Sequence, residues 1–186
     1  MANKIKYGIK NCFYAVKSGS GYGTPIAIPG AVSIALDPQG ELYKFYADNI
    51  EYFRAAVNNG YEGDLEVALL PDSFYEDVLN NEIDSTDKVM IEMADPGTTE
   101  FALGFQFEGD EKASRFWFYN CVATRPEVEG DTKEQNIQVK TEKVKISCTP
   151  GSDGIVRART TGETTTAIYN GWFSAVYPAT VPVVSG

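Results

Sequence analysis

The 186-residue chain contains no histidine. Activation of a serine or cysteine nucleophile by histidine is therefore excluded, and so is any zinc site that needs imidazole ligands. No apolar run is long enough to span a membrane, and the first ten residues lack the apolar core of a signal peptide. We therefore expect a protein that is made in the cytoplasm and is not exported by a signal peptide.

Positive charge and cysteine are also scarce. The chain has 16 basic and 26 acidic residues, a formal net charge of −10, which argues against a surface that binds phosphates or anionic lipids. The acidity is also consistent with a simple role in solubility. The three cysteines, Cys12, Cys121 and Cys148, show no C-x-x-C spacing and are too few for an all-cysteine zinc site. We expect them to be buried, reduced thiols.

Alternation of apolar and polar residues predicts strands over much of the chain. A first hairpin is expected from residues 31–36 and 41–49 around an Asp-Pro-Gln-Gly turn, and a second from residues 101–108 and 115–124. One short helix is expected at about residues 72–80, with Phe74 and Val78 as its packing face. The pattern therefore predicts a mostly β fold with one short helix.

The two ends of the chain show less periodicity than its centre. Residues 1–30 are rich in Gly, Ser, Pro and Tyr and predict an N-terminal arm or long loop. Residues 31–162 form the expected β domain. Residues 163–186 contain Pro178 and Pro182 and predict a C-terminal strand or arm outside the centre of a sheet.

Three carboxylates, Glu62, Asp64 and Glu66, alternate along the expected strand 61–70 and so share one face, opposite Leu65 and Val67. General acid–base catalysis would need one of them to be shifted by burial, and nothing apolar shares their face. A calcium loop of the D-x-D-x-D-G type is absent. Two interpretations remain, an ordinary exposed polar face or a deliberately acidic surface, and no catalytic, cofactor or metal site is predicted.

Aromatic residues gather in two places. Tyr43, Phe45, Tyr46, Tyr52 and Phe53 lie close together in the sequence and are compatible with sugar stacking, contact with a partner, or a plain core. The strand 115–124 is apolar at nearly every position, which indicates that both of its faces are covered, in a sandwich interior or at an oligomer interface. The basic residues Arg157 and Arg159 are interpreted as part of a solvated strand face.

Several blocks, in order, resemble a known family. They are KYGIKNCFYA, IPGAVSIALDPQGE, FYADN, NNGYEGDLEVALLPDSFYEDVL, FALGFQFEGD and FYNCVATRP, and they cover roughly residues 4–160. Together they resemble the major tail protein of long-tailed phages, in the version common in phages and prophages of Gram-positive bacteria.

The resemblance implies a tail tube protein with a β-sandwich or barrel, extended terminal arms, and strands that close into a ring-shaped inner β-barrel on oligomerisation. Such subunits form hexameric rings that stack into a hollow tube in the virion tail. The implied partners are other copies of the chain, the tape measure protein, and the tail terminator and distal tail proteins. DNA would pass through the lumen without specific binding, and neither a membrane nor a cofactor is involved.

The resemblance also suggests roles for particular residues. The acidic row Glu62, Asp64 and Glu66 becomes a hypothesis for lumen lining, because like charge keeps DNA phosphates from sticking. Phe74 and Val78 would pack the helix on the outside of the barrel. The remaining expected contacts are a ring-to-ring stacking loop with Tyr43, Tyr46, Asp48, Asn49, Tyr52 and Phe53, and a subunit or sheet interface with Phe116, Trp117, Phe118 and Tyr119.

Three other functions stay open at this point. The first is the tube protein of a related contractile or type VI-like injection system. The second is a carbohydrate-binding or adhesin β-domain, which would use exposed tyrosines and Trp172. The third is a hydrolase without histidine that uses paired carboxylates.

Overall fold

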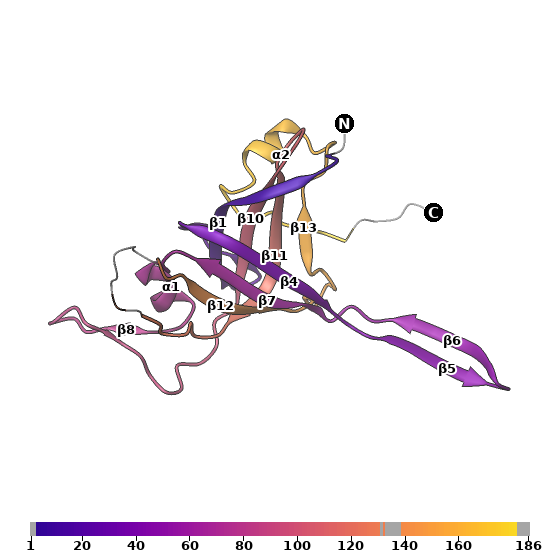
Figure 1. Ribbon diagram of the computed structural model, residues 1–186, viewed down its shortest axis with the longest axis horizontal. Helices are drawn as coiled ribbons and strands as arrows, with labels where there is room; N and C mark the ends of the chain where they lie inside the picture. Colours follow the sequence, from indigo (N-terminus) through magenta and orange to yellow (C-terminus); the bar gives the residue numbers. More distant parts are fainter. Residues whose placement is uncertain (1–2, 131, 133–138, 182–186) are drawn as a thin grey trace.

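A computed structural model describes residues 3–130, 132 and 139–181 of the chain (Figure 1). The fold is mostly β, with 47% of residues in strands and 6% in helices, as the sequence predicts. The main sheet has nine strands in the order β2-β1-β10-β11-β12-β7-β4, with β3 also paired to β1 and β13 to β11. Its strands are β1 (Lys6–Ser18), β2 (Gly21–Tyr22), β3 (Ile26–Ile28), β4 (Ala31–Gln39), β7 (Gly60–Val67), β10 (Phe101–Gly109), β11 (Ser114–Ala123), β12 (Glu142–Cys148) and β13 (Arg157–Arg159).

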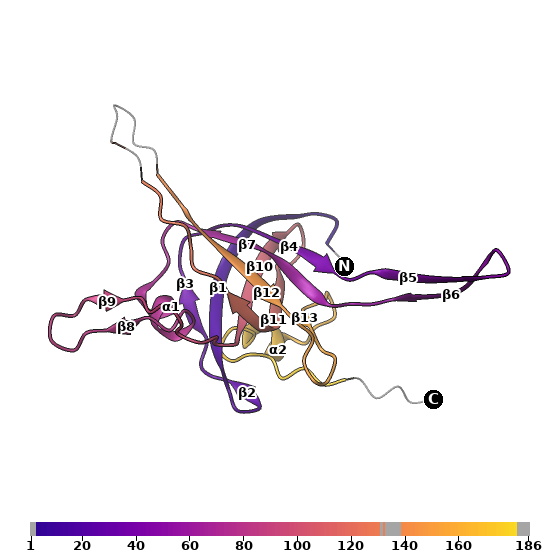
Figure 2. The same ribbon diagram turned by 90° about the horizontal axis from the view of Figure 1, so that it is seen from below.

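Two small hairpins stand outside this sheet. The first consists of β5 (Leu42–Ala47) and β6 (Ile50–Ala56), and the second of β8 (Glu82–Ile83) and β9 (Met90–Ile91). Figure 2 shows them extending from opposite sides of the body. Within the described residues the main sheet does not close into a barrel. Closure of an inner barrel therefore stays a prediction about the assembled protein.

One face of the main sheet packs on the helix α1 (Asp72–Asp77), which lies inside the range expected for a helix. Phe74 is fully buried, and its ring meets those of Tyr14 and Phe101 edge to face at 5.2 and 5.8 Å between centroids. Val78 is buried in the same cluster. Asn80 then adopts a left-handed conformation, with φ of 56°, and the chain turns away.

The other face of β10 and β11 is covered by the C-terminal segment. This segment contains α2 (Thr166–Asn170), followed by Trp172, which is buried. Trp117 Nε1 donates a hydrogen bond to the Trp172 carbonyl oxygen at 2.9 Å, and the Tyr119 hydroxyl donates one to the Tyr177 carbonyl oxygen at 2.7 Å. Opposite Trp117 on β10 is Gly104, where a Cβ atom would come within 2.6 Å of the indole ring. The indole therefore needs glycine at position 104.

The expected arm or loop at residues 1–30 is wrong, because residues 21–22 and 26–28 form β2 and β3, and residues 6–18 form β1, which lies between these short strands and β10. The strand pairs with β10 along most of its length, but its register shifts twice, between Tyr7 and Ile9 and between Lys10 and Phe13. Gly8 and Asn11 lie at these shifts with positive φ values of 56° and 52°. Each irregularity reverses the side-chain alternation, so the sequence shows no continuous period of two.

The expected first hairpin is also wrong. β4 pairs with β7, and residues 42–47 pair with β6 instead of with residues 31–36. Pro38, taken as a turn residue, lies within β4 opposite Tyr61. β4 is the last strand of the sheet, where a residue without an N–H group is tolerated. At the other end of the chain, residues 163–181 contain α2 and no strand, in contrast to the strand or arm that was expected.

The cysteines differ from the expected reduced state. Cys121 and Cys148 occupy directly opposed positions on β11 and β12 and are joined by a disulfide, so the prediction of reduced thiols is wrong for both. Their sequence separation of 27 residues gave no indication of this register. Cys12 is free and buried, and burial raises its pKa to about 12.

We expect the native protein to show no thiol that reacts with a small disulfide reagent at neutral pH. Cys12 is buried, and a thiol with a raised pKa has very little of the reactive thiolate. In denaturant without reductant one thiol should react, since the disulfide holds the other two cysteines. The measurement is a thiol titration of native and unfolded protein. Three reactive thiols in the unfolded, unreduced chain would contradict the disulfide.

Candidate assembly surfaces

The hairpin of β5 and β6 projects from the body as a two-stranded ribbon, which we call the arm (residues 41–57) (Figure 1). It continues the β4–β7 pair, and its base is joined by backbone hydrogen bonds from Val57 N to Glu41 O at 3.0 Å and from Asn59 N to Gln39 O at 2.8 Å. Gly40 is required at this base, because a Cβ atom there would lie 1.9 Å from the Val57 carbonyl oxygen.

The tip of the arm is a two-residue turn at Asp48 and Asn49. Both residues have positive φ values, 51° and 63°, and they connect Ala47 to Ile50, which are paired across the ribbon. A turn with two left-handed residues matches the twist of a hairpin, and Asn and Asp are among the residues that tolerate it. Asp48 and Asn49, which were expected in a ring-to-ring stacking loop, are therefore the two turn residues of a hairpin.

Large apolar side chains are exposed along the whole arm. Tyr52 is 72% exposed and Tyr46 59%. The charged residues Lys44, Glu51 and Arg54 cluster, with Lys44 Nζ 3.3 Å and Arg54 Nη1 3.9 Å from the Glu51 carboxylate. The other exposed apolar side chains of the arm are Leu42, Tyr43, Phe45, Ile50, Phe53 and Val57. An isolated two-stranded ribbon with this surface is marginally stable in water, which indicates that a partner covers it.

The six residues expected in a stacking loop are therefore brought together by the structure. Tyr43, Tyr46, Tyr52 and Phe53 project from the two strands of the arm, and Asp48 and Asn49 form its tip. Residues 41–49 were expected to form a strand paired with residues 31–36, and the stacking region was expected to be a loop. Both strands of the arm belong to one hairpin, with a register shift between Phe45 and Tyr46. Its role in contact between copies stays a proposal.

The acidic row lies on the outward face of β7, between β4 and β12. Glu62 and Asp64 are exposed and Glu66 is partly exposed. The row does not stand alone, because Asp64 is opposite Lys145 and Glu66 is opposite Lys143 on β12. On the β4 side, the residues opposite Glu62, Asp64 and Glu66 are Asp37, Ala35 and Ser33. The face carries both signs of charge, with the acidic residues in excess.

Glu66 is held in its charged form by two hydroxyl donors. Thr141 Oγ1 donates to Glu66 Oε1 at 2.6 Å, and Ser33 Oγ donates to Glu66 Oε2 at 2.9 Å. These bonds, that from Thr141 most, lower the pKa of the Glu66 carboxyl below its usual value. A lowered pKa is the opposite of what a general acid at neutral pH requires.

The four aromatic residues of β11 are buried by the chain itself. Phe116 and Phe118 belong to the cluster beneath β7 and β12, and Trp117 and Tyr119 pack under the C-terminal segment. Both faces of the strand are covered, as its apolar sequence indicates, but by layers of the same chain. Trp172 is 4% exposed and lies against Tyr177, so it offers no surface for stacking on a sugar.

Two further surface features were not predicted from the sequence. The β8–β9 hairpin exposes Ile83 and Ile91, and Met93 is exposed in the segment after it. Arg125 ties this segment to the body by an ion pair with Glu92 at 3.1 Å. Arg157 and Arg159 are exposed on β13, which confirms the interpretation as a solvated strand face, and they also line a cavity beside β4. Only the fold could reveal this, because the cavity is lined by segments far apart in sequence.

A metal site or a membrane helix finds no support in the described residues. Among them no group of three His, Cys, Asp or Glu side chains is placed to hold a metal ion. No helix in the same part of the chain is long and apolar enough to cross a membrane.

Solved structures that match the chain include components of the anti-feeding prophage and of an extracellular contractile injection system. A chain in the cryo-EM structure of the anti-feeding prophage baseplate, six-fold symmetrised, matches with a TM-score of 0.50 and 8% identity, over 88% of this chain and 99% of that chain. A chain in the cryo-EM structure of the cap that terminates the anti-feeding prophage tube matches with a TM-score of 0.46 and 9% identity, over 85% of this chain and 94% of that chain.

A chain of the sheath–tube complex of the PVC extracellular contractile injection system, in its extended state, matches with a TM-score of 0.45 and 10% identity, over 85% of this chain and 93% of that chain. No protein-family model and no curated protein matches the chain. At 8% identity the baseplate match shows a common fold. The chain therefore has a fold that is also found in a component of the anti-feeding prophage baseplate.

Proposed function

We propose that this chain is a structural subunit that polymerises into the tube of a phage tail or of a related injection machine. One observation carries the proposal: a ribbon with exposed apolar side chains along its length projects from the body. Such a surface is suited to repeated contact between copies. The fold shared with a chain of a six-fold symmetrised baseplate supports the same class. The proposed role is structural, without a catalytic residue.

In its finer form, the proposal is that hexameric rings stack into a tube in the virion tail. The tube would assemble around a tape measure protein, end on terminator and distal tail proteins, and conduct DNA without binding it specifically. The sequence blocks favour the tail of a long-tailed phage of Gram-positive bacteria. A tube protein of a contractile system is the second candidate, favoured by the structural match to the baseplate chain.

The test is negative-stain electron microscopy of the purified protein at rising concentration, with its mass measured in parallel. Rings or hollow tubes with six-fold symmetry are the expected result. A monomer at every concentration, including after addition of preformed tail complexes, would overturn the proposal. Binding of that monomer to a glycan panel would then support the adhesin alternative, for which the exposed tyrosines of the arm are available.

The acidic row gives a prediction about the lumen. We expect tubes of a Glu62→Lys, Asp64→Lys variant to retain short double-stranded DNA at low salt and to release it as salt is raised, because added lysines contact phosphates. Wild-type tubes should retain little. The measurement is co-sedimentation of fluorescent DNA with tubes. The control reverses two exposed charges on α1, Asp72→Lys with Glu76→Lys. Equal retention of DNA by both variants would contradict the assignment of the acidic row to the lumen.

A further inference from the structure

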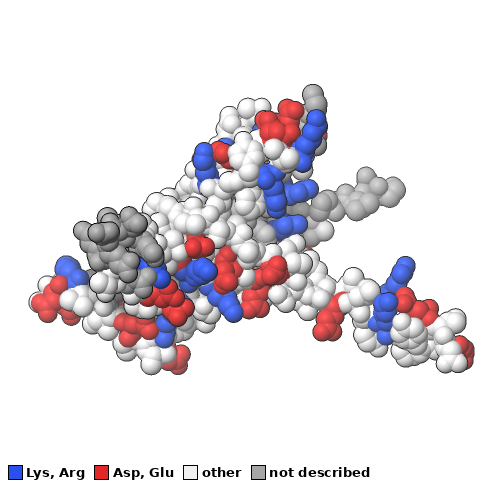
Figure 3. All heavy atoms as spheres, in the orientation of Figure 1, with Lys and Arg blue, Asp and Glu red and all other residues white. Residues whose placement is uncertain are grey.

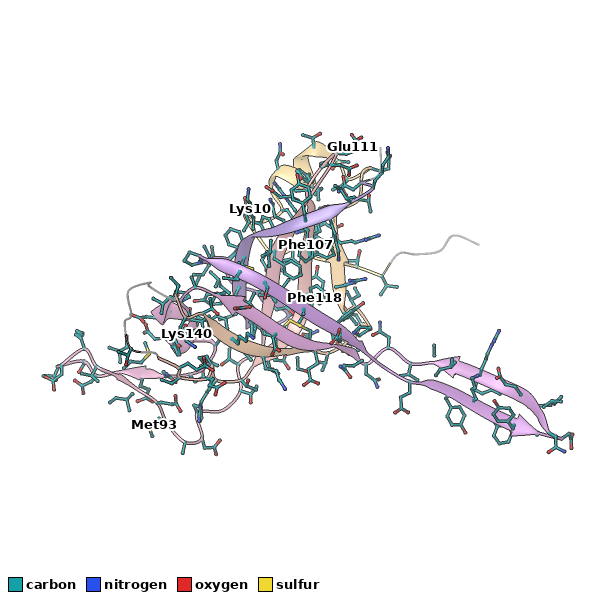
Figure 4. The ribbon with its side chains drawn as sticks, viewed as in Figure 1. Lys10, Met93, Phe107, Glu111, Phe118 and Lys140 are labelled. Carbon is teal, nitrogen blue, oxygen red and sulfur yellow. A yellow bond between two sulfur atoms is a disulfide. The ribbon has the colours of Figure 1, made fainter. Side chains whose placement is uncertain are left out.

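A groove of about 650 Å³ opens between the N-terminal segment, β4 and β13. Its floor is aromatic, and Figure 4 shows two of its residues, Phe107 and Phe118, in the space between β1 and β4. Phe105 stacks on Phe116 and on Phe118, with centroids 5.3 and 5.7 Å apart. Phe105, Phe116 and Phe118 are themselves buried, so the apolar surface open to a ligand beside the edge strand β4 is that of the partly buried residues Ile34, Leu36, Tyr61 and Phe107.

The rim of this groove is basic, although the chain as a whole has a net charge of −10. Lys4, Lys6, Arg157 and Arg159 line it, against one acidic residue, Asp37. The amine of Lys6 lies 5.0 Å from the ring centroid of Phe107, and the guanidinium of Arg157 lies 5.0 Å from that of Tyr61. Figure 3 shows Lys and Arg side chains gathered beside β13 and the N-terminal end. The groove thus suits a ligand that combines aromatic rings with negative charge.

The tip of the arm, residues 46–52, has this combination. Its acidic residues are Asp48, in the turn, and Glu51, which is paired with Lys44 and Arg54 farther down the arm. Tyr46, Ile50 and Tyr52 are exposed on it. We propose that the tip of the arm of one copy occupies the basic aromatic groove of a second copy. This inference rests on the proposed function, because it names the contact by which the subunits polymerise.

The geometry favours a second copy over the arm's own groove. The arm continues the β4–β7 pair as a ribbon directed away from the body (Figures 1 and 2). Arm and groove are different surfaces, so each copy has one of each to offer. A contact of this kind repeats from copy to copy instead of closing a two-fold dimer.

A charge exchange tests the contact. The groove variant is Arg157→Glu with Arg159→Glu, and the arm variant is Asp48→Lys with Glu51→Lys. Each should raise the protein concentration needed for assembly by about tenfold or more, because like charges then face each other. The chain that carries all four substitutions should assemble within about threefold of wild type, since the attraction is restored with its signs reversed. Circular dichroism checks that each variant is folded.

Cross-linking tests the same contact without reversing any charge. One population carries Ile50→Cys at the tip of the arm, and the other carries Lys6→Cys at the rim of the groove; both positions are exposed. A short thiol cross-linker should give heterodimers from the mixed populations. The control replaces the groove variant with Glu76→Cys, an exposed position on α1, and should give none.

Three outcomes would overturn the inference. If tubes form normally but no cross-link joins the arm to the groove, this contact is contradicted, whereas the proposed function is not. If the groove variant fails to assemble and the chain with all four substitutions does not recover assembly, something other than the arm occupies the groove. No assembly of the wild-type chain under any condition would overturn the proposed function and this contact together.

Discussion

Removing the arm should abolish assembly and leave the subunit folded. Gln39 and Gly60 are paired at the base of the arm, so residues 40–59 can be replaced by Asn-Gly, which closes the β4–β7 hairpin with a two-residue turn. The exposed apolar side chains of the arm leave with it, and none of the buried core residues lies in the removed segment. We expect rings and tubes to be absent in electron micrographs at every concentration at which wild type forms them.

The folded state of the shortened chain is the control for this experiment. Its unfolding midpoint in urea should stay close to that of wild type, because the core clusters are unchanged. A milder version replaces Tyr46 and Tyr52 with serine, and its matched control is Val128→Ser, since Val128 is 98% exposed but lies outside the arm. Assembly of the armless chain at the wild-type concentration would show that the subunits join through other surfaces.

Trp117→Ala should lower the free energy of unfolding by about 3–5 kcal/mol, the usual cost of removing a large aromatic side chain from a core. The indole is fully buried, and its N–H group satisfies the Trp172 carbonyl oxygen. Alanine would leave a cavity opposite Gly104 and a buried acceptor without its donor. Urea unfolding followed by circular dichroism measures the loss.

The C-terminal segment should respond to the same change. Because it packs on β11 through Trp117 and Tyr119, residues 166–179 should become sensitive to protease at concentrations that leave wild type intact. Ile168→Ala is the control, since Ile168 is 44% exposed on α2 and its loss should cost less than about 0.5 kcal/mol. A loss at Trp117 as small as that of the control would mean that the segment does not depend on this contact.

The fold class was predictable because most of the core strands alternate regularly. Phe101, Leu103 and Phe105 on β10, and the helix that begins at Asp72, follow the periods that define a strand and a helix. β1 was missed because Gly8 and Asn11 break its alternation at two places. Its assignment depends on pairing with β10, about a hundred residues away, and no local pattern contains that information.

The candidate surfaces were predictable to a different degree. The number and proximity of the aromatic residues of the arm suggested partner contact as one of three interpretations, and the structure shows that they are exposed. The hairpin was placed on the wrong partner strand because Asp37 and Pro38 resemble a turn. The groove could not be predicted, since Lys6, Phe107 and Arg157 come together only in the folded chain. The positions of Lys143 and Lys145 opposite the acidic row could not be predicted either, because they depend on the register of β7 with β12.

The continuity of the arm with the main sheet has a mechanical consequence. Both strands of the ribbon run directly into β4 and β7, and β7 is hydrogen-bonded on its other side to β12. Tension on the tip therefore pulls these strands along their own length. The hydrogen bonds that resist such a pull are loaded together in shear, whereas a strand peeled from its end loses them one after another. The arm can thus transmit force into the centre of the subunit without unravelling its edge.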